Sequence, residues 1–223
     1  MKRRLGENRP IGFVICLLAL AGCGSETRSV PKSVGTGEVD LQRLNADRDA
    51  GQWLANGRDI GKTFYSPLQD IDRDNVSRLG FAWEFQTGTA RGMESTPQVI
   101  DGVMYTSSSW SKVYAYDAAT GKELWRFDPK VPGTIAKSVC CDVVNRGVAA
   151  WNGKIYVGTL DGRLIAIDAK TGKPVWSTVT VDQSKPYTIT GAPRVFKGKV
   201  VIGNSGAEYG VRGYVTAYDA ETG

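Results

Sequence analysis

The 223-residue chain contains no histidine. This absence excludes a Ser-His-Asp catalytic triad and a histidine-ligated zinc site within this stretch. The chain also lacks a large net charge of either sign. The formal net charge is +5, and residues 1–22 hold four basic residues and one glutamate, which leaves +2 for the rest (5 − 4 + 1). Such a small excess is not typical of a nucleic-acid-binding domain, and we expect no nucleic-acid partner.

A long apolar run is missing as well. The run Ile11–Leu20 follows a basic N-terminus and is too short to cross a bilayer as a mature helix. It ends in Leu-Ala-Gly-Cys23, which resembles a bacterial lipoprotein cleavage box. The sequence therefore predicts a lipoprotein signal peptide over residues 1–22, a lipid on Cys23 and a flexible tether over residues 23–50. An ordinary signal peptide with a chance cysteine is the alternative.

Cysteine is scarce, with four residues, and the expected signal and lipid site account for Cys16 and Cys23. The other two, Cys140 and Cys141, are adjacent. Their Cα atoms should lie about 3.8 Å apart across a trans peptide, closer than the roughly 4.4–6.8 Å of ordinary disulfides. The doublet alone leaves two possibilities open. Export would permit a strained vicinal disulfide, whereas two reduced, buried thiols would pack as small hydrophobes.

An internal repeat organises the rest of the chain. The pattern Ala-x-Asp-x-x-Thr-Gly starts at Ala115, Ala166 and Ala217, so its period is 51 residues, and the first two copies continue to Trp125 and Trp176. A fixed period near 50 indicates a solenoid or a propeller. We interpret the tryptophans as packing residues that fill the space between neighbouring repeats.

Each repeat also carries a hairpin signal, an apolar run interrupted by a turn that contains glycine. An alternating segment then leads to the Asp-x-x-Thr-Gly turn, and the chain returns toward the tryptophan. Four short strands in each period would form one propeller blade. The three hairpin segments are Val99–Tyr105, Ala150–Val157 and Val195–Ile202.

The repeat and its tryptophans resemble those of the eight-bladed quinoprotein dehydrogenases, and the segment Trp53–Trp83 resembles the start of that family. The fit is closest to the methanol/ethanol branch, which uses pyrroloquinoline quinone (PQQ). The resemblance implies an all-β fold in which residues 51–223 form about three N-terminal blades of a truncated propeller. It also implies an alcohol dehydrogenase that depends on PQQ and a metal and oxidises small primary alcohols. The electron acceptor would be a cytochrome c-type protein or another carrier.

The same resemblance assigns the cofactor contacts. In the family a vicinal disulfide covers one face of the cofactor, and Cys140 and Cys141 match it. The guanidinium of Arg146, five residues later, suits a carboxylate or a quinone oxygen. Taken singly, these positions would be ordinary loop, strand-end or surface residues, and the joint match in sequence order favours the site. The further matches are Glu94, Thr190, Ser205, Gly206 and Ala207.

A metal ligand is expected in the third repeat. Gly153 precedes Ala166 by 13 residues, whereas Gly198 precedes Ala217 by 19, so this repeat is six residues longer. Glu208 lies in the extra segment and offers the hard oxygen that calcium prefers. The resemblance makes it a ligand of calcium or a lanthanide, and it places the catalytic base, an aspartate, further along the protein. We therefore expect no catalytic residue here and an inactive fragment.

The expected location is periplasmic, on a membrane-anchored lipoprotein of a Gram-negative bacterium. A second function fits the anchor equally well. Outer-membrane assembly lipoproteins combine propeller repeats with a lipid and act as scaffolds without a cofactor or enzymatic activity. They are not expected to carry the cysteine pair, the arginine after it or the Ser-Gly-Ala-Glu segment.

Overall fold

The computed structural model describes residues 37–45 and 51–223. The predicted signal peptide, Cys23 and most of the predicted tether lie outside these residues. Within the described ranges, no helix has the length and apolar character needed to cross a membrane.

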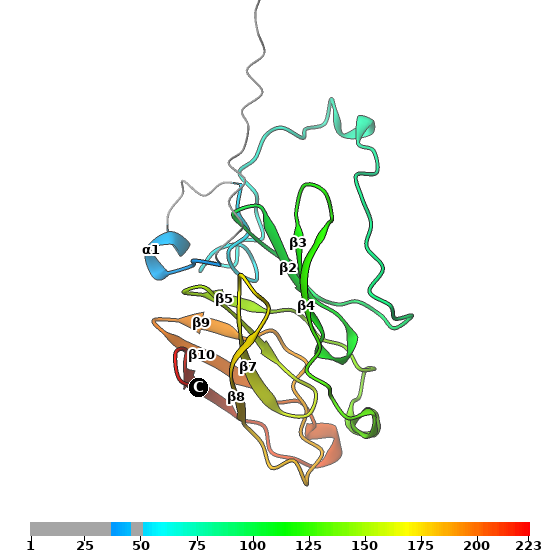
Figure 1. Cartoon of the computed structure of the whole chain (residues 1–223), viewed down its shortest axis with the longest axis vertical. Helices are drawn as coiled ribbons and strands as arrows, with labels where there is room; N and C mark the ends of the chain where they lie inside the picture. The colour runs from blue at the N-terminus through cyan, green and yellow to red at the C-terminus, as the bar shows by residue number, and fades with distance from the viewer. Residues whose placement is uncertain (1–36, 46–50) are drawn as a thin grey trace, which may run out of the picture. The chain divides into compact units, whose positions relative to one another are not determined.

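The fold consists of successive antiparallel sheets, each built from strands that are consecutive in sequence (Figure 1). Two sheets have four strands, in the orders β1-β2-β3-β4 and β5-β6-β7-β8, and the third has three, in the order β9-β10-β11. The four-strand repeat predicted from the sequence is therefore confirmed for the first two blades. The strands are β1 (Gln98–Ile100), β2 (Val103–Ser107), β3 (Val113–Asp117), β4 (Glu123–Phe127), β5 (Ala149–Trp151), β6 (Lys154–Gly158), β7 (Arg163–Asp168), β8 (Pro174–Val179), β9 (Arg194–Phe196), β10 (Lys199–Gly203) and β11 (Val215–Asp219).

Helical structure is limited to short pieces. The helix α1 (Leu41–Leu44) starts after Asp40, whose side chain accepts a hydrogen bond from the backbone N–H of Arg43 at 2.6 Å. The remaining pieces are short 3₁₀ segments of three to six residues, over Val76–Arg78, Ser109–Ser111, Gly133–Ser138 and Ala207–Tyr209.

Two-residue turns close the predicted hairpins. Between β5 and β6, Asn152 and Gly153 have φ angles of 43° and 72°. Both angles are positive, as a type I′ turn requires, and this turn follows the right-handed twist of the strands. Trp151 consequently pairs with Lys154, and Ala149 pairs with Tyr156.

The Asp-x-x-Thr-Gly turn also has the predicted geometry. In the second blade, the carboxylate of Asp168 accepts hydrogen bonds from the backbone N–H and the hydroxyl of Thr171, both at 2.7 Å. These bonds lower the pKa of Asp168, and the hydroxyl has the largest effect. Gly172 follows with φ of 70°, where a residue without Cβ is favoured.

Trp83, Trp125 and Trp176 each pack on the turn of the following blade. The indole N–H of Trp83 donates to the carbonyl of Ala118 at 3.1 Å, and that of Trp176 donates to Ala220 at the same distance. Trp83 belongs to residues 81–85, which carry the same apolar alternation as β4 but pair with no strand in the described part of the chain. This segment therefore occupies the place of an outer strand that precedes the first blade.

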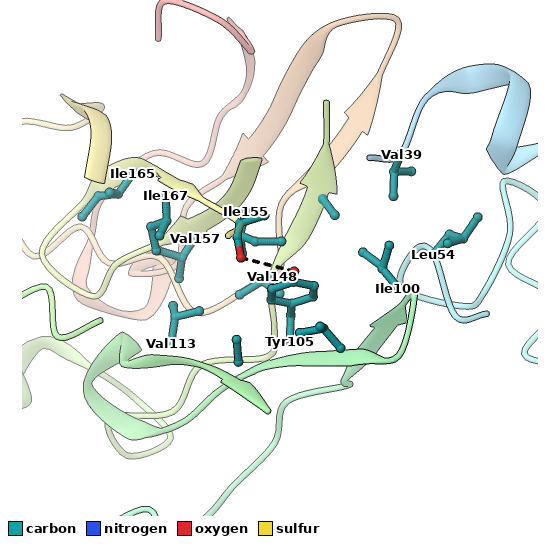
Figure 2. Packing of buried hydrophobic residues seen from close by; sticks show 14 residues of the cluster. Val39, Leu54, Ile100, Tyr105, Val113, Val148, Ile155, Val157, Ile165 and Ile167 are labelled. Carbon is teal, nitrogen blue, oxygen red and sulfur yellow. Dashed lines mark hydrogen bonds between the residues drawn. The ribbon is translucent and has the colours of Figure 1, made fainter. Parts of the chain in front are cut away.

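The hydrophobic core lies between successive sheets. One cluster joins the first blade to the second through residues such as Tyr105, Val113, Ile155 and Ile165, which are at most 1% exposed (Figure 2). A second cluster joins the second blade to the third. Since apolar burial is the main favourable term in folding, each blade depends on its neighbour for stability.

The segment 37–45 differs from its predicted role. Val39 is 1% exposed within the first core cluster, and its carbonyl accepts a hydrogen bond from Asn152 at 3.0 Å. Arg43 forms an ion pair with Asp101 at 2.6 Å. The prediction of a flexible tether through residue 50 is therefore wrong for residues 37–45, because Val39 and Leu44 contribute apolar side chains to the core.

Candidate functional site

Cys140 and Cys141 form a disulfide in the structure, with their Cα atoms 3.8 Å apart. Both residues are exposed, so the alternative of two buried, reduced thiols is wrong. The loop is anchored on either side of the pair, because Val139 and Val143 pack with Leu160 in a small buried cluster. The disulfide is therefore presented to solvent by a fixed loop.

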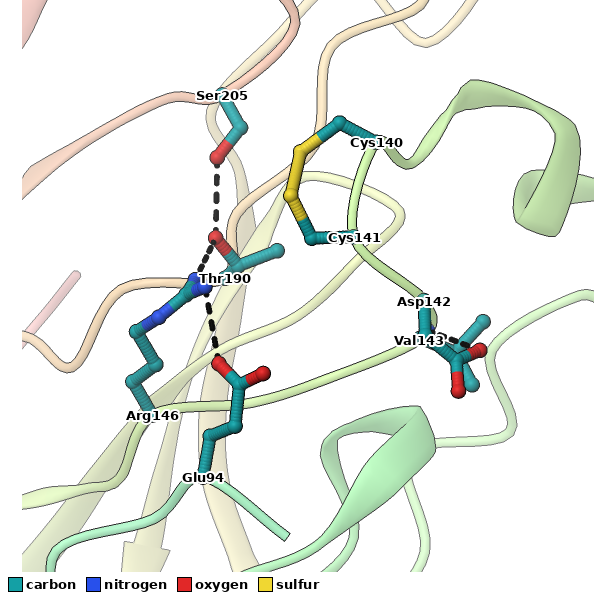
Figure 3. Close-up of a disulfide and its surroundings, with 8 residues drawn as sticks. All are labelled: Glu94, Cys140, Cys141, Asp142, Val143, Arg146, Thr190 and Ser205. Carbon is teal, nitrogen blue, oxygen red and sulfur yellow. Dashed lines mark hydrogen bonds and ion pairs between the residues drawn. A yellow bond between two sulfur atoms is a disulfide. The ribbon is translucent and has the colours of Figure 1, made fainter. Parts of the chain in front are cut away.

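Four of the predicted site residues form one continuous chain of polar contacts beside the disulfide (Figure 3). A carboxylate oxygen of Glu94 lies 2.9 Å from the guanidinium of Arg146. Arg146 donates to the hydroxyl of Thr190 at 2.8 Å, and Thr190 lies 3.1 Å from the hydroxyl of Ser205.

The repeat explains why these residues meet. Glu94, Arg146 and Thr190 each precede the first strand of a blade by three or four positions, so they lie at corresponding ends of β1, β5 and β9. Ser205 comes just after β10, and its backbone forms a bridge with Thr188, with N–O distances of 2.7 and 3.3 Å. A site assembled from the same end of successive strands brings together residues that are far apart in sequence.

Backbone hydrogen bonds hold the three strand ends side by side. The N–H of Arg146 donates to the carbonyl of Thr190 at 2.9 Å, and the carbonyl of Arg146 accepts from Thr96 at 3.4 Å. Gly147 has φ of 129°, and a Cβ on it would lie 3.2 Å from the Thr96 carbonyl oxygen. Glycine at this position permits the close approach of the two segments.

The charged part of this chain is open to a ligand. The side chains of Arg146 and Glu94 are 42% and 41% exposed, and an ion pair with this exposure contributes little to stability. Arginine carries five N–H donors in a planar fork and can receive a further carboxylate while it keeps Thr190 as an acceptor. The donor set of one guanidinium and two hydroxyls therefore fits an anionic, oxygen-rich ligand.

The remaining predicted residues follow Ser205 directly. Gly206 is buried with φ of 111°, and a Cβ there would overlap the carbonyl oxygen of Pro186. Ala207 and Glu208 lie exposed in the next 3₁₀ turn. Glu208 makes no hydrogen bond or ion pair with the rest of the described chain. Within residues 37–45 and 51–223, no group of three or more histidine, cysteine, aspartate or glutamate residues could hold a metal.

Two residues that support the site were not singled out from the sequence. Ser95, next to Glu94, accepts hydrogen bonds from the hydroxyl of Thr106 at 3.0 Å and from the N–H of Ser107 at 3.1 Å. Asn145, next to Arg146, is 1% exposed. Each of the two residues adjoins a predicted ligand-binding residue in the sequence. The sequence alone does not show which neighbours of such a residue point inward.

These features define a partial β-propeller with a candidate ligand site at the ends of the first strands of its blades. The model of the glucose/ethanol/alcohol dehydrogenase β-propeller domain matches residues 53–223. The chain belongs to this family of PQQ-dependent alcohol dehydrogenases.

The similar proteins agree with this assignment. The chain is 55% identical over 216 residues to quinohemoprotein alcohol dehydrogenase ADH IIB of Pseudomonas putida, an alignment that covers 96% of this chain and 30% of the relative. It is 59% identical over 170 residues to 1-butanol dehydrogenase (cytochrome c) of Thauera butanivorans, with 76% and 25% covered. The chain thus spans about 30% of the length of its curated relatives.

Solved structures give the same fold. The quinohemoprotein alcohol dehydrogenase ADHIIG of Pseudomonas putida superposes with a TM-score of 0.82 at 57% identity, covering 84% of this chain and 28% of that one. A europium-containing methanol dehydrogenase gives a TM-score of 0.75 at 47% identity, covering 78% and 31%. The predicted partial β-propeller is therefore confirmed, and the scaffold alternative receives no support.

Proposed function

We propose that the protein containing this chain is a PQQ-dependent alcohol dehydrogenase that oxidises primary alcohols in the periplasm. The observation that carries this proposal is the polar chain from Glu94 through Arg146 and Thr190 to Ser205, which lies beside an exposed vicinal disulfide. Family membership independently supports the same chemistry.

The residues present fit the cofactor. PQQ is a planar tricyclic quinone with three carboxylates, so its recognition requires cationic and hydroxyl donors at its edge and a surface against its face. Arg146 would bind a carboxylate or quinone oxygen through its planar fork, and Thr190 and Ser205 would supply hydroxyl donors. The disulfide of Cys140 and Cys141 would shield one face of the ring system from water.

Each residue then has a distinct role in binding. Glu94 balances the charge of Arg146, and it also offers an acceptor to a cofactor donor. Gly206 and Ala207 would bring the backbone close to the cofactor, because neither carries a large side chain. When bound, PQQ would accept the two electrons that the alcohol loses.

We also propose that Glu208 is one ligand of a calcium or lanthanide ion that acts as a Lewis acid. Its position in the longer third repeat, immediately after the proposed cofactor contacts, supports this role. A lanthanide occurs in one of the similar solved structures, the europium-containing methanol dehydrogenase. The other ligands and the catalytic base would come from outside the described residues.

The proposed substrate and electron acceptor draw on the relatives. One is named 1-butanol dehydrogenase (cytochrome c), and others are named quinohemoprotein alcohol dehydrogenases. A small primary alcohol and a cytochrome c-type acceptor are therefore the proposed partners.

The proposed location rests on the N-terminal sequence. Lipid on Cys23 would hold the protein on the periplasmic side of a membrane. Cys23→Ala should move the full-length protein from the membrane fraction to the soluble fraction. An unchanged distribution would contradict the anchor without affecting the enzymatic proposal.

The enzymatic proposal is tested by titrating PQQ into the full-length apoprotein. Arg146→Ala should weaken PQQ binding by at least about tenfold, because it removes a charged, bidentate donor. Arg146→Lys should restore only part of the affinity, since an ammonium group lacks the planar fork. Arg126→Ala is the matched control, because Arg126 is also exposed and paired with a glutamate, Glu123. Equal PQQ affinity in Arg146→Ala and the control would overturn the site.

A further inference from the structure

Asn145 is a buried polar residue whose side chain uses its full hydrogen-bonding capacity. It is 1% exposed. Its amide oxygen accepts from the hydroxyl of Ser107 at 2.6 Å and from the backbone N–H of Gly147 at 3.1 Å. Its amide nitrogen donates to the carbonyl of Gly158 at 2.8 Å and to the hydroxyl of Ser111 at 3.3 Å. A side-chain amide offers two donors and two acceptor sites, so all four are occupied.

These partners belong to two different blades. Ser107 ends β2 in the first blade, and Ser111 lies in the turn that follows it. Gly158 ends β6 in the second blade. The hydroxyl of Ser111 also accepts from the N–H of Leu160, two residues further along the second blade, at 3.3 Å. The amide of Asn145 is therefore fixed by the packing of one blade against the next.

The hydrogen bond from the Gly147 N–H to the fixed Asn145 amide also restrains the backbone of Arg146, which lies between the two residues. An oxygen of an asparagine side chain that accepts the N–H two residues later closes an Asx turn, and the residue in between has its backbone set by that turn. Here the residue in between is Arg146. Its side chain is 42% exposed, so side-chain packing holds it only in part, and the direction of the guanidinium depends on the backbone that carries it.

We propose that Asn145 is the positioning residue of the cofactor site, which orients Arg146 toward PQQ by an Asx turn anchored at the interface of the first two blades. This inference rests on the proposed function, because it assigns to Arg146 the role of a cofactor donor. Asn145 itself is buried and acts through Arg146.

The test is a double-mutant cycle in the full-length protein, with the dissociation constant of PQQ as the readout. Asn145→Ala removes the Asx turn and should weaken PQQ binding by about tenfold, the lower end of what supporting residues usually contribute. In an Arg146→Ala background the same substitution should change the affinity by less than about twofold, because two residues that act through one contact are not additive. If the double variant instead loses PQQ affinity by the product of the two single-variant losses, the proposal is wrong.

A second variant separates positioning from stability. Asn145→Asp keeps the oxygen that closes the Asx turn but loses both amide donors and places a carboxylate beside the Gly158 carbonyl. The Asp variant should therefore melt at a lower temperature than the wild type and still bind PQQ within about threefold of it. A loss of affinity as large as that of Asn145→Ala would show that the residue acts only through stability, and the proposal would fail.

A destabilised control completes the design. Val200→Ala removes two methyl groups from a fully buried position in β10 of the third blade, and Val200 takes no part in the polar chain. It should lower the melting temperature and leave the PQQ dissociation constant unchanged. Failure of the proposed cofactor site differs from failure of the positioning role. If the cofactor site is wrong, Arg146→Ala alone binds PQQ as the wild type does, whatever the result at Asn145.

Discussion

The indole N–H of Trp125 donates a hydrogen bond to the main-chain carbonyl of Ala169, 44 residues later, at 2.9 Å. The ring lies against Gly172, the last residue of the turn in the following blade. Trp176 and Ala220 repeat this relationship at the same separation. Each blade thus places its outer strand on the turn of the next blade, so the 51-residue repeat specifies both the blade and its docking.

Gly172→Ala should destabilise the full-length protein more than an ordinary glycine replacement. A Cβ at residue 172 would lie 2.7 Å from the ring of Trp125, in addition to the strain of φ at 70°. Gly102→Ala is the control, because its φ is 78° and no atom lies within 4 Å of its added Cβ. The control should cost about 1–2 kcal/mol from the left-handed backbone alone, and Gly172→Ala about 1–3 kcal/mol more from overpacking. Equal losses in chemical denaturation would contradict the docking role of the glycine.

The vicinal disulfide should be present in full-length protein purified without a reducing agent. Without reduction, the peptide that contains Cys140 and Cys141 should weigh two hydrogen masses less than the dithiol, and neither cysteine should react with an alkylating agent. After reduction both should react readily, since both are exposed. Alkylation of the pair before reduction would contradict the disulfide.

Replacing both cysteines by serine separates the structural and functional roles of this pair. Because the flanking Val139 and Val143 remain buried, the melting temperature of the full-length protein should change little. PQQ affinity should fall, since one face of the cofactor would lose its cover. An unaltered dissociation constant would show that the disulfide makes no contribution to the site.

Glu208→Ala in the full-length enzyme should lose bound metal and alcohol-dependent dye reduction together. Removing the carboxylate takes away a charged, hard ligand, so metal affinity and Lewis-acid activation should fall in parallel. Glu221→Ala is the control, because Glu221 is equally a surface carboxylate but pairs with Lys154 at 2.7 Å. Full metal content in Glu208→Ala would contradict the proposed role of Glu208 as a metal ligand.

Acid should destabilise the third blade through Asp219. The hydrogen bond from the ammonium of Lys199, followed by those from backbone N–H groups, lowers the pKa of Asp219 to about 2. The unfolded chain should have the ordinary aspartate pKa of about 3.9. The stabilising contribution is therefore fully present above about pH 4 and is lost as the pH falls through about 2. Lys199→Met should lower the free energy of unfolding at neutral pH and make it fall less steeply between about pH 4 and pH 2. Lys197→Met should change neither. If the free energy of unfolding falls equally steeply with acid in both variants, Asp219 is not the group responsible.

The sequence by itself determined the local structure and the family. Alternation of period two, glycine-containing turns and the 51-residue spacing predict the strands of each blade, because these signals depend on residues that are close in sequence. The Asp-x-x-Thr-Gly turn followed by tryptophan likewise specifies its own geometry. The site residues could be named in advance because of a resemblance, and their identities alone do not imply that they meet.

Only the tertiary structure decided which of these residues contact one another. Arg146 reaches Thr190 across 44 positions because successive blades bring the same strand ends together, and local sequence carries no such distance information. The same packing draws Val39 into the core, where the polar composition around it predicted a free tether. The packing of the blades also buries the side chain of Asn145, which forms four hydrogen bonds at the interface of the first two blades. A buried polar side chain is specified by the partners around it, and those partners are assembled only when the blades pack.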